Sequence, residues 1–241
     1  MRDEGRSDSR LEAMRLPITP ATTLLRELRD EVRQHYRGGR ILIAVDGIDG
    51  AGKTIFADAL AEVFAEDGSA VFRASIDDFH RPRMERHARG RRSPEGHYRD
   101  SYDYATFRRV LIDPFREGVQ TGATTGFQLA AYDVARDTPV ESAWTTAPRD
   151  AVLIVDGIFL HRPELRGLWN WSVWLDVPID IAAQRLALRD GSDPNPSAPA
   201  HARYRGGQEL YLKEADPRSE ASAIVDNTDL AHPRRVYQDY C

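Results

Sequence analysis

The sequence has very little cysteine: Cys241, at its C-terminal end, is the only one among 241 residues. A disulfide framework and a zinc site with several cysteine ligands are therefore excluded, and the composition fits a reducing compartment. The sequence also lacks any apolar run near the length of about 18 residues that a membrane-spanning helix requires, and its opening MRDEGRSDSR is too charged for a secretory signal. We therefore expect a cytoplasmic protein with no membrane partner.

An excess of positive charge is also missing, and lysine is almost absent. The formal net charge is −5 and the pI is near 5.8. Because a protein that binds a phosphate backbone needs a broad positive surface, we expect a small-molecule substrate and no nucleic acid. Of the 33 basic residues only Lys53 and Lys213 are lysine. A lysine kept against this bias indicates a position that needs a compact ammonium group instead of a planar guanidinium.

Short apolar runs alternate with helical patterns from about residue 21 onward. A run bounded by turn residues, such as RILIAVDG, is typical of a strand buried on both faces of a parallel sheet. The pattern predicts an α/β fold, a three-layer sandwich with a mostly parallel sheet of five strands, in a single domain over 21–241. The expected strands are 40–47, 70–76, 151–157, 171–177 and 222–227.

Other segments have different expected structures. Residues 1–20 are polar and unpatterned, which predicts disorder, whereas ATTLLRELRDEVRQHY after them has apolar positions at helical spacing. Residues 81–104 are rich in arginine, histidine and tyrosine and are expected to form a long loop, followed by a helix in YATFRRVLIDPF. Residues 118–149 predict an irregular excursion with a β-hairpin at FQLAAYDV.

A glycine-rich string after the first expected strand matches the phosphate-loop pattern G-x-x-x-x-G-K-[ST]. In such a loop the backbone wraps the phosphate chain, and N–H groups and a helix N-terminus point at the anion. We expect ATP as the donor, Lys53 to span its outer phosphates and Thr54 to bind Mg²⁺. The expected ATP-binding residues are Gly47, Ile48, Asp49, Gly50, Ala51, Gly52, Lys53 and Thr54.

Aspartates end several of the expected strands. Asp156 follows VLIV, where a P-loop enzyme is expected to hold Mg²⁺, and Asp176 in WLDV is the alternative. Asp77 and Asp78 end the second strand. They suit a turn or helix cap, but transfer to a hydroxyl also requires a carboxylate that accepts its proton. Given the phosphate loop, we favour a metal role for Asp156 and a role in transfer for the pair.

The ordered segments SIDDFHRPR, GHYRDSYDYATF, AAYDVARDTPV, VLIVDGIFL and RLALRD, behind GIDGAGKT, resemble the uridine kinase and phosphoribulokinase group of P-loop kinases. The resemblance covers nearly everything from Arg40 to Asp229. It implies an ATP- and Mg²⁺-dependent phosphotransferase with an alcohol group as acceptor. The 5′-hydroxyl of uridine or cytidine is the expected acceptor; pantothenate, ribulose phosphate, nicotinamide riboside and other sugars are alternatives.

The same resemblance implies roles for individual residues. Asp77 matches the proposed base of the group, and Tyr132 and Asp133 match a Y-D-F segment that helps to hold the nucleobase. The implied substrate-binding residues are Asp78, His80, Tyr98, Tyr132 and Asp137.

The sequence departs from the group's pattern at three of its acceptor positions. His80 stands in place of a tyrosine, Asp137 falls where a histidine is usual, and the pair His97 and Tyr98 does not reproduce an Asp-His pair. Because these positions shape the acceptor pocket, phosphoryl transfer is a firmer expectation than uridine as the acceptor.

Arginines in the helix at about 179–190 are candidates for stabilising the transferring phosphoryl group. Arg185 and Arg189 are four residues apart, hence on one face, and resemble the arginines of a kinase lid, here about 185–208. A solvated helix face is the alternative, and Arg203 and Arg205 compete for the lid role.

The run of arginines from Arg81 to Arg99 has two interpretations. It has the chemistry to hold an anionic acceptor such as a sugar phosphate, but charge blocks are usually solvated, and we favour a solvated loop.

The sequence gives less support to two rival functions. A nucleotide-dependent switch or hydrolase would leave the 81–104 segment without an evident use, and the sequence has no N-K-x-D guanine-binding string. A degenerate nucleotide-binding scaffold is disfavoured because Lys53, Thr54, Asp77 and Asp156 are all present. The sequence leaves the oligomeric state open and is compatible with a homo-oligomer.

Overall fold

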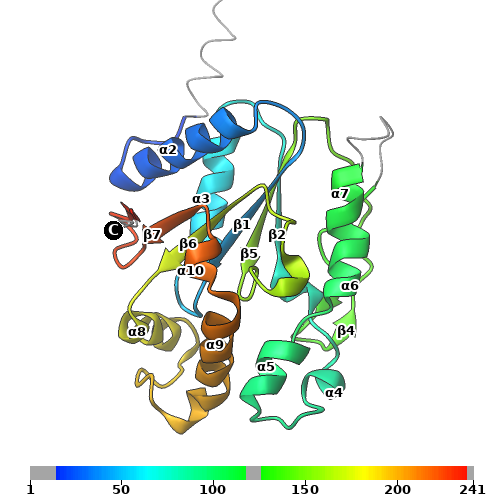
Figure 1. Ribbon diagram of the computed structural model, residues 1–241, viewed down its shortest axis with the longest axis vertical. Helices are drawn as coiled ribbons and strands as arrows, with labels where there is room; N and C mark the ends of the chain where they lie inside the picture. Colours follow the sequence, from blue (N-terminus) through cyan, green and yellow to red (C-terminus); the bar gives the residue numbers. More distant parts are fainter. Residues whose placement is uncertain (1–14, 118–125, 238–241) are drawn as a thin grey trace, which may run out of the picture.

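The computed structural model describes residues 15–117 and 126–237. These residues form a six-stranded sheet and the helices that cover it (Figure 1). The strand order is β2-β5-β1-β6-β7-β8; the first five strands are parallel and β8 is antiparallel to β7. The strands are β1 (Ile41–Gly47), β2 (Val71–Ser75), β5 (Val152–Gly157), β6 (Trp171–Asp176), β7 (Ala223–Asp226) and β8 (Arg234–Val236).

The five expected strands are all present, each within one residue of its predicted bounds at either end. The prediction that the sheet has only five strands is wrong, because β8 adds a sixth at the edge. This strand has the sequence RRV and therefore lacks the apolar run by which the others are found. Short, charged strands are typical of sheet edges, where they discourage further pairing. Arg235 of β8 is ion-paired with Glu31.

Helices cover both faces of the sheet, which confirms the three-layer α/β architecture (Figure 1). The helices are α2 (Pro20–His35), α3 (Lys53–Ala65), α4 (Arg83–Arg86), α5 (Pro94–Asp100), α6 (Tyr104–Phe107), α7 (Asp113–Glu117), α8 (Ile179–Asp190), α9 (Ala202–Ala215) and α10 (Pro217–Glu220). Short 3₁₀ turns are η1 (Ile76–Phe79), η3 (Pro163–Leu165) and η4 (Pro199–His201), and a π-helical turn, η2, spans Arg108–Ile112.

Alternate residues of the central strands face two separate apolar cores. In β1, Ile41, Ile43 and Val45 pack with α2 and α3, whereas Leu42 and Ala44 pack with the aromatic side chains of α5, α6, α7 and α9. This is the period of two that a pleated strand imposes. Because both faces are covered, every residue of β1 is buried and its sequence is almost continuously apolar.

The segment expected to be one long loop, 81–104, is partly helical. It contains α4 and α5, each begun by a proline or serine at the N-cap, so the loop prediction is wrong for these residues. The helix expected in YATFRRVLIDPF is present but its middle turn is π-helical. Figure 1 shows α4, α5, α8 and α9 in the lower part of the view, beyond the ends of the strands.

The predicted hairpin is also present, in shortened form. Strands β3 (Tyr132–Asp133) and β4 (Thr138–Pro139) pair antiparallel, and Ala131 donates a hydrogen bond to the carbonyl of Asp78, which joins the hairpin to the end of β2. Within the expected excursion at 118–149, residues 118–125 lie outside the described residues, as do residues 1–14 of the segment expected to be disordered.

Helix α2 is an integral part of the core. A reciprocal cap between Thr19 and Thr22 begins it, and its buried side chains are the four that have helical spacing in the sequence: Leu24, Leu25, Leu28 and Val32. They pack against α3, and Arg26 of α2 is ion-paired with Glu66 at 2.7 Å. The helix therefore stabilises the element that follows the phosphate loop.

Replacing Leu28 by alanine should lower the free energy of unfolding by about 2 to 5 kcal/mol, the usual loss for a buried leucine, because Leu28 is fully buried. Leu188→Ala, on the surface of α8, is the matched control and should change stability by less than about 0.5 kcal/mol. Urea unfolding curves of both variants measure the difference. Equal stabilities would contradict the assignment of α2 to the core.

Candidate active site

The expected phosphate loop joins β1 to α3, as its sequence predicts. Gly52 is the N-cap of α3, and both it and Gly50 have left-handed φ angles, 87° and 78°. A Cβ atom on Gly50 would also clash with the carbonyl oxygen of Ala182 in α8. Glycine is therefore required at residue 50 for two independent reasons. The Nζ of Lys53 donates a hydrogen bond to the carbonyl of Ile48 at 2.8 Å, so its ammonium group lies over the loop.

The two residues expected to bind Mg²⁺ meet in the structure. The Thr54 hydroxyl donates a hydrogen bond to Asp156 at 2.7 Å, and the other Asp156 oxygen is ion-paired with Arg73 at 2.8 Å. Asp176, the alternative, is instead ion-paired with Arg218. A hydroxyl beside a carboxylate at the start of a phosphate loop fits Mg²⁺, which takes one or two protein ligands and completes its shell with phosphate and water. Hence Asp156 is the better candidate.

Asp77 and Asp78 lie in η1, directly after β2, and have different surroundings. Tyr102 donates a hydrogen bond to the Asp77 carboxylate at 2.8 Å, and the ring Nδ1 of His80 donates to the Asp77 carbonyl at 2.7 Å. Burial raises the pKa of Asp78, and the neighbouring charges of Asp77 and Asp156 raise it further. Since Ser75 is directly opposite Asp156 in the sheet, both aspartates end close to the expected metal site.

A cavity of about 770 Å³ opens beside η1, between the 80–101 segment and helices α8 and α9. His80, one of the expected acceptor residues, lines it, and Ser101 and Tyr204 lie at its walls. His80 follows η1, which itself follows the carboxyl end of β2, the edge of the sheet at which α/β proteins bind ligands. The cavity is therefore the candidate acceptor site.

The other four residues expected to bind the substrate are not among those that line this cavity. Asp78 lies next to it in η1, two residues before His80. Tyr132 and Asp137 lie behind it: the Tyr132 hydroxyl donates to Asp137 at 2.9 Å, and Asp137 is ion-paired with Arg86, which does line the cavity. Tyr98 is buried in the aromatic core and its neighbour His97 faces the cavity instead. The cavity is therefore lined by His80 alone among the five predicted substrate-binding residues, and their roles stay predictions.

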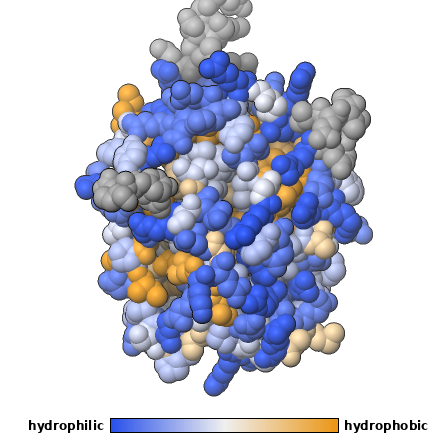
Figure 2. All heavy atoms as spheres, in the orientation of Figure 1, coloured by the Kyte–Doolittle hydropathy of each residue, from blue (hydrophilic) through white to orange (hydrophobic). Residues whose placement is uncertain are grey.

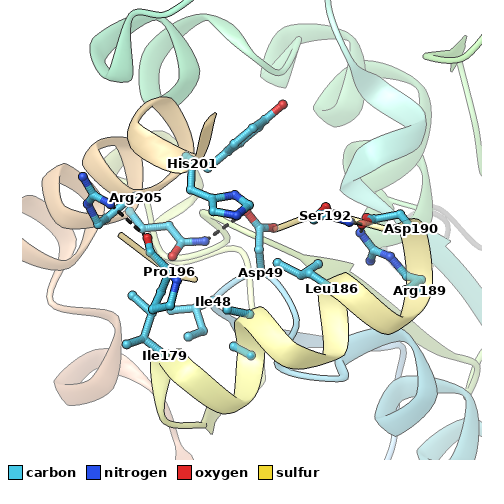
Figure 3. A pocket seen from close by; sticks show the side chains of 14 residues that line it. Ile48, Asp49, Ile179, Leu186, Arg189, Asp190, Ser192, Pro196, His201 and Arg205 are labelled. Carbon is cyan, nitrogen blue, oxygen red and sulfur yellow. Dashed lines mark hydrogen bonds and ion pairs between the residues drawn. The ribbon is translucent and has the colours of Figure 1, made fainter. Parts of the chain in front are cut away.

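A second cavity, of about 280 Å³, lies between the phosphate loop, α8 and α9. Figure 3 shows Asp49 of the loop facing His201, with Leu186 and Ile179 of α8 on the side of the cavity nearer the sheet. Gln208 of α9 donates a hydrogen bond to Asp49 at 3.0 Å. On the face drawn in Figure 2, apolar side chains gather in the area where Figure 1 places α8.

The two arginines expected to close the lid differ in their contacts. Arg189 lines both cavities, and its partner is Asp190 at 2.9 Å. Arg185 donates to the carbonyls of Ala51, Asn227 and Thr228, which ties the phosphate loop to the segment after β7. The competing lid candidates each line one cavity: Arg203 lines the larger and Arg205 the smaller. Arg189 is therefore the stronger lid candidate, and Arg185 holds the loop in place.

A buried polar cluster below the phosphate loop was missed by the sequence analysis. Asp46 is fully buried and accepts hydrogen bonds from the Tyr211 hydroxyl of α9 and from His161, whose Nε2 contacts Ser172 at 3.0 Å. Burial and the Asp46 charge hold the pKa of Tyr211 well above its usual value, so Tyr211 remains a donor. An aspartate inside an otherwise apolar strand is the signal that could have indicated it.

Solved structures resemble the chain over most of its length. A possible uridine kinase from Bacillus stearothermophilus has a TM-score of 0.61 at 23% identity and covers 84% of this chain and 100% of its own. D-glycerate 3-kinase from Cryptococcus neoformans has a TM-score of 0.59 at 10% identity and covers 91% and 100%. The chain has the fold of the P-loop kinases.

Sequence comparison agrees with the fold. A curated protein named uridine kinase, from Aeromonas hydrophila, is 24% identical over 153 residues, which are 62% of this chain and 68% of the relative. No family model matches the chain. The expected resemblance to uridine kinases is confirmed, and the relatives support a phosphotransferase with a hydroxyl acceptor.

Two negative findings apply to the described residues. No helix in 15–117 or 126–237 is long and apolar enough to cross a bilayer. Within the same ranges, His, Cys, Asp and Glu side chains form no group of three or more able to hold a metal ion. A Mg²⁺ ion at Thr54 and Asp156 would therefore depend on phosphate oxygens for its binding, as in other phosphate-loop sites.

Asp77 and Asp78 should separate by role when each is replaced by asparagine. Asp77→Asn keeps the shape but removes the proton acceptor, so turnover should fall roughly 10²- to 10⁴-fold while nucleotide binding survives. Asp78→Asn should cost less turnover and raise the KM of the acceptor. Steady-state kinetics and nucleotide titration distinguish the two. An inactive Asp78→Asn beside a near-normal Asp77→Asn would mean that the base is Asp78.

Arg185→Ala and Arg189→Ala should also differ. Arg189→Ala should lower turnover with little loss of nucleotide affinity, because a lid completes the site after binding. Arg185→Ala removes two partly buried hydrogen bonds and one exposed one to backbone carbonyls, so it should lower stability by about 1 to 3 kcal/mol and weaken nucleotide binding. Turnover, nucleotide titration and thermal unfolding measure the contrast. If Arg189→Ala turns over normally, Arg189 belongs to the solvated surface.

Proposed function

We propose that the protein is an ATP- and Mg²⁺-dependent kinase that transfers the γ-phosphoryl group to a hydroxyl of a small metabolite. One observation carries the proposal: the Thr54 hydroxyl lies 2.7 Å from Asp156, which is opposite Ser75 at the end of β2. Asp77 and Asp78 follow directly in η1. Phosphate loop, metal-binding pair and candidate base thus share one edge of the sheet. A cavity for an acceptor opens beside them.

Each group has a distinct task in the proposed reaction. The loop amides and Lys53 bind the phosphate chain, and Arg189 stabilises charge on the transferring group from the lid side. Thr54 and Asp156 would hold Mg²⁺, which would neutralise charge on the phosphate chain when bound. Asp77, oriented by Tyr102, accepts the proton of the acceptor hydroxyl as its oxygen bonds to the γ-phosphorus.

The 5′-hydroxyl of uridine or cytidine is the acceptor that the named relatives suggest. Structures of similar fold include a D-glycerate kinase, so the fold alone is compatible with other acceptors. A hydrolase or switch is less well supported, because neither needs the cavity beside η1 or the carboxylate pair Asp77 and Asp78 next to the candidate metal site.

A coupled assay of ADP release with Mg·ATP tests the proposal over nucleosides, pantothenate, sugars, sugar acids and sugar phosphates. We expect ADP release to depend on one class of acceptor. Lys53→Ala should reduce it by about 10²- to 10³-fold, because the charge on the outer phosphates is no longer compensated. Lys213→Ala, at the exposed second lysine, is the matched control and should behave as the wild type.

Two results would count against the kinase. Equal ADP release with and without every acceptor would favour the hydrolase. Wild-type turnover in Lys53→Ala would remove the argument from the phosphate loop.

A further inference from the structure

The candidate acceptor cavity carries positive charge on nearly every wall. Among the described residues, its lining includes five arginines, three histidines and no carboxylate. Most of these side chains come from α4, α5 and the segment between them, with Arg189 and Arg203 added from α8 and α9. The lining residues that carry or can carry positive charge are His80, Arg83, Arg86, His87, Arg91, His97, Arg189 and Arg203.

Three of the five arginines form no ion pair with an acidic side chain in the part of the chain that the structure describes. Arg86 is ion-paired with Asp137 at 3.2 Å and Arg189 with Asp190 at 2.9 Å. Arg83, Arg91 and Arg203 form no ion pair among residues 15–117 and 126–237. Arg203 instead donates to the carbonyl of Arg91 at 2.7 Å, which holds its guanidinium beside the 86–91 segment.

The arginines are close enough to influence one another. Burial lowers the pKa of His87, and the charges of Arg203, Arg86, Arg91 and Arg83 lower it further. Burial also lowers the pKa of Arg203, with a contribution from Arg86. Like charges gathered around one cavity are destabilising unless an anion compensates them. In a fully solvated loop the arginine side chains would separate. Here Arg203 of α9 lines the same cavity as Arg83 and Arg91 and is hydrogen-bonded to the Arg91 carbonyl.

His97 adds a hydrogen-bonding group to the same cavity. It is only 7% exposed, and its Nε2 has no hydrogen-bond partner among the residues that the structure describes. Burial, followed by the Arg203 charge, lowers its pKa to about 3. Ser101 donates its hydroxyl proton to the His97 carbonyl, so the Nδ1 contact to Ser101 requires Nδ1 to be the protonated nitrogen. The Nε2 of the neutral ring is then an acceptor, which suits a ligand hydroxyl.

We propose that the phosphoryl acceptor is a small polyhydroxylated anion, whose phosphate or carboxylate group is bound by Arg83, Arg91 and Arg203. A ligand hydroxyl donates to His97 Nε2, and a second hydroxyl faces Asp77. This inference rests on the proposed kinase function and narrows its acceptor from a neutral nucleoside to an anion. It also changes our interpretation of the arginine run, because Arg83, Arg86 and Arg91 line a cavity, whereas Arg89 and Arg99 are ion-paired at the surface.

The transfer is balanced with these groups alone. The acceptor oxygen bonds to the γ-phosphorus of ATP, the bond from that phosphorus to the β–γ bridging oxygen breaks, and ADP leaves with that electron pair. The acceptor proton passes to Asp77. The arginines take no part in bond changes; they fix the anion and so select which hydroxyl reaches the phosphorus.

The first experiment compares acceptors that differ in charge but share a carbon skeleton: ribose, ribose 5-phosphate and ribonate, with uridine as the neutral nucleoside. We expect kcat/KM for at least one anion to exceed that for ribose and uridine by about 100-fold, the effect of two charge-assisted hydrogen bonds. A phosphate preference would indicate a phosphorylated acceptor and a carboxylate preference a sugar acid; both support the inference.

The second experiment measures binding without turnover. With the phosphate loop saturated by a non-hydrolysable ATP analogue and Mg²⁺, ribose 5-phosphate or ribonate should raise the unfolding midpoint, and ribose at equal ionic strength should not. Arg83→Gln and Arg203→Gln should abolish this shift and raise the acceptor KM about 10- to 100-fold, far more than the KM of ATP. Arg83→Lys should restore part of it.

Arg92→Gln is the matched control, because Arg92 is exposed in the same segment but does not line the cavity. Arg83 is exposed and its side chain makes no ion pair among the described residues, so Arg83→Gln remains interpretable if Arg203→Gln fails to fold. An anion-dependent shift in wild type that persists in Arg83→Gln would overturn the inference, as would the absence of any such shift. Uridine phosphorylated in preference to every anion would overturn the inference while leaving the kinase intact.

Discussion

The geometry of the site depends on one carboxylate at the end of the central strand β5. Asp156 accepts a hydrogen bond from Thr54, which follows β1, and is ion-paired with Arg73 of β2. It therefore joins the two neighbouring strand ends that supply the phosphate loop and the candidate base. Because β1, β5 and β2 are parallel neighbours in register, Asp156 at the end of β5 can contact residues from both adjacent strands. A metal ion at Thr54 would lie beside it and face the reacting phosphates.

Helix α9 is attached to the strand and loop beside Asp156 by one buried and one partly buried polar contact. Tyr211 of α9 donates to Asp46 beneath the phosphate loop, and Gln208, one turn earlier, donates to Asp49 within it. Unpaired, the buried Asp46 would be costly, so its hydrogen bonds strongly favour one position of α9. The same helix carries Arg203 into the acceptor cavity. The position of Arg203, which we propose binds the anion, is thus coupled to β1, the strand that leads into the phosphate loop.

The distribution of ion pairs explains how a protein with a net charge of −5 can have a strongly basic cavity. Acidic side chains pair with arginines elsewhere, as Glu66 does with Arg26, and none lines the acceptor cavity. A focused positive site in an acidic protein favours small anions and disfavours extended ones, because only the cavity attracts them. The neutral His97 beside these arginines adds selectivity for hydroxyl groups without adding charge.

The sequence by itself determined the parallel sheet, the phosphate loop and the candidate metal-binding pair, because these are encoded by local strings: apolar runs for the strands, GIDGAGKT, and VLIVDG with Asp156. Of the five residues predicted to bind the acceptor, only His80 lines the candidate acceptor cavity. It did not reveal β8, whose RRV sequence carries no apolar signal, or the exchange of Tyr98 for His97 at the cavity wall, which depends on which face of α5 is buried. Above all, only the tertiary structure brought Arg203 from α9 to Arg83 and Arg91. The sequence gives the charge of an arginine. Whether its side chain contacts water, a carboxylate or other arginines depends on how segments more than 100 residues apart pack together.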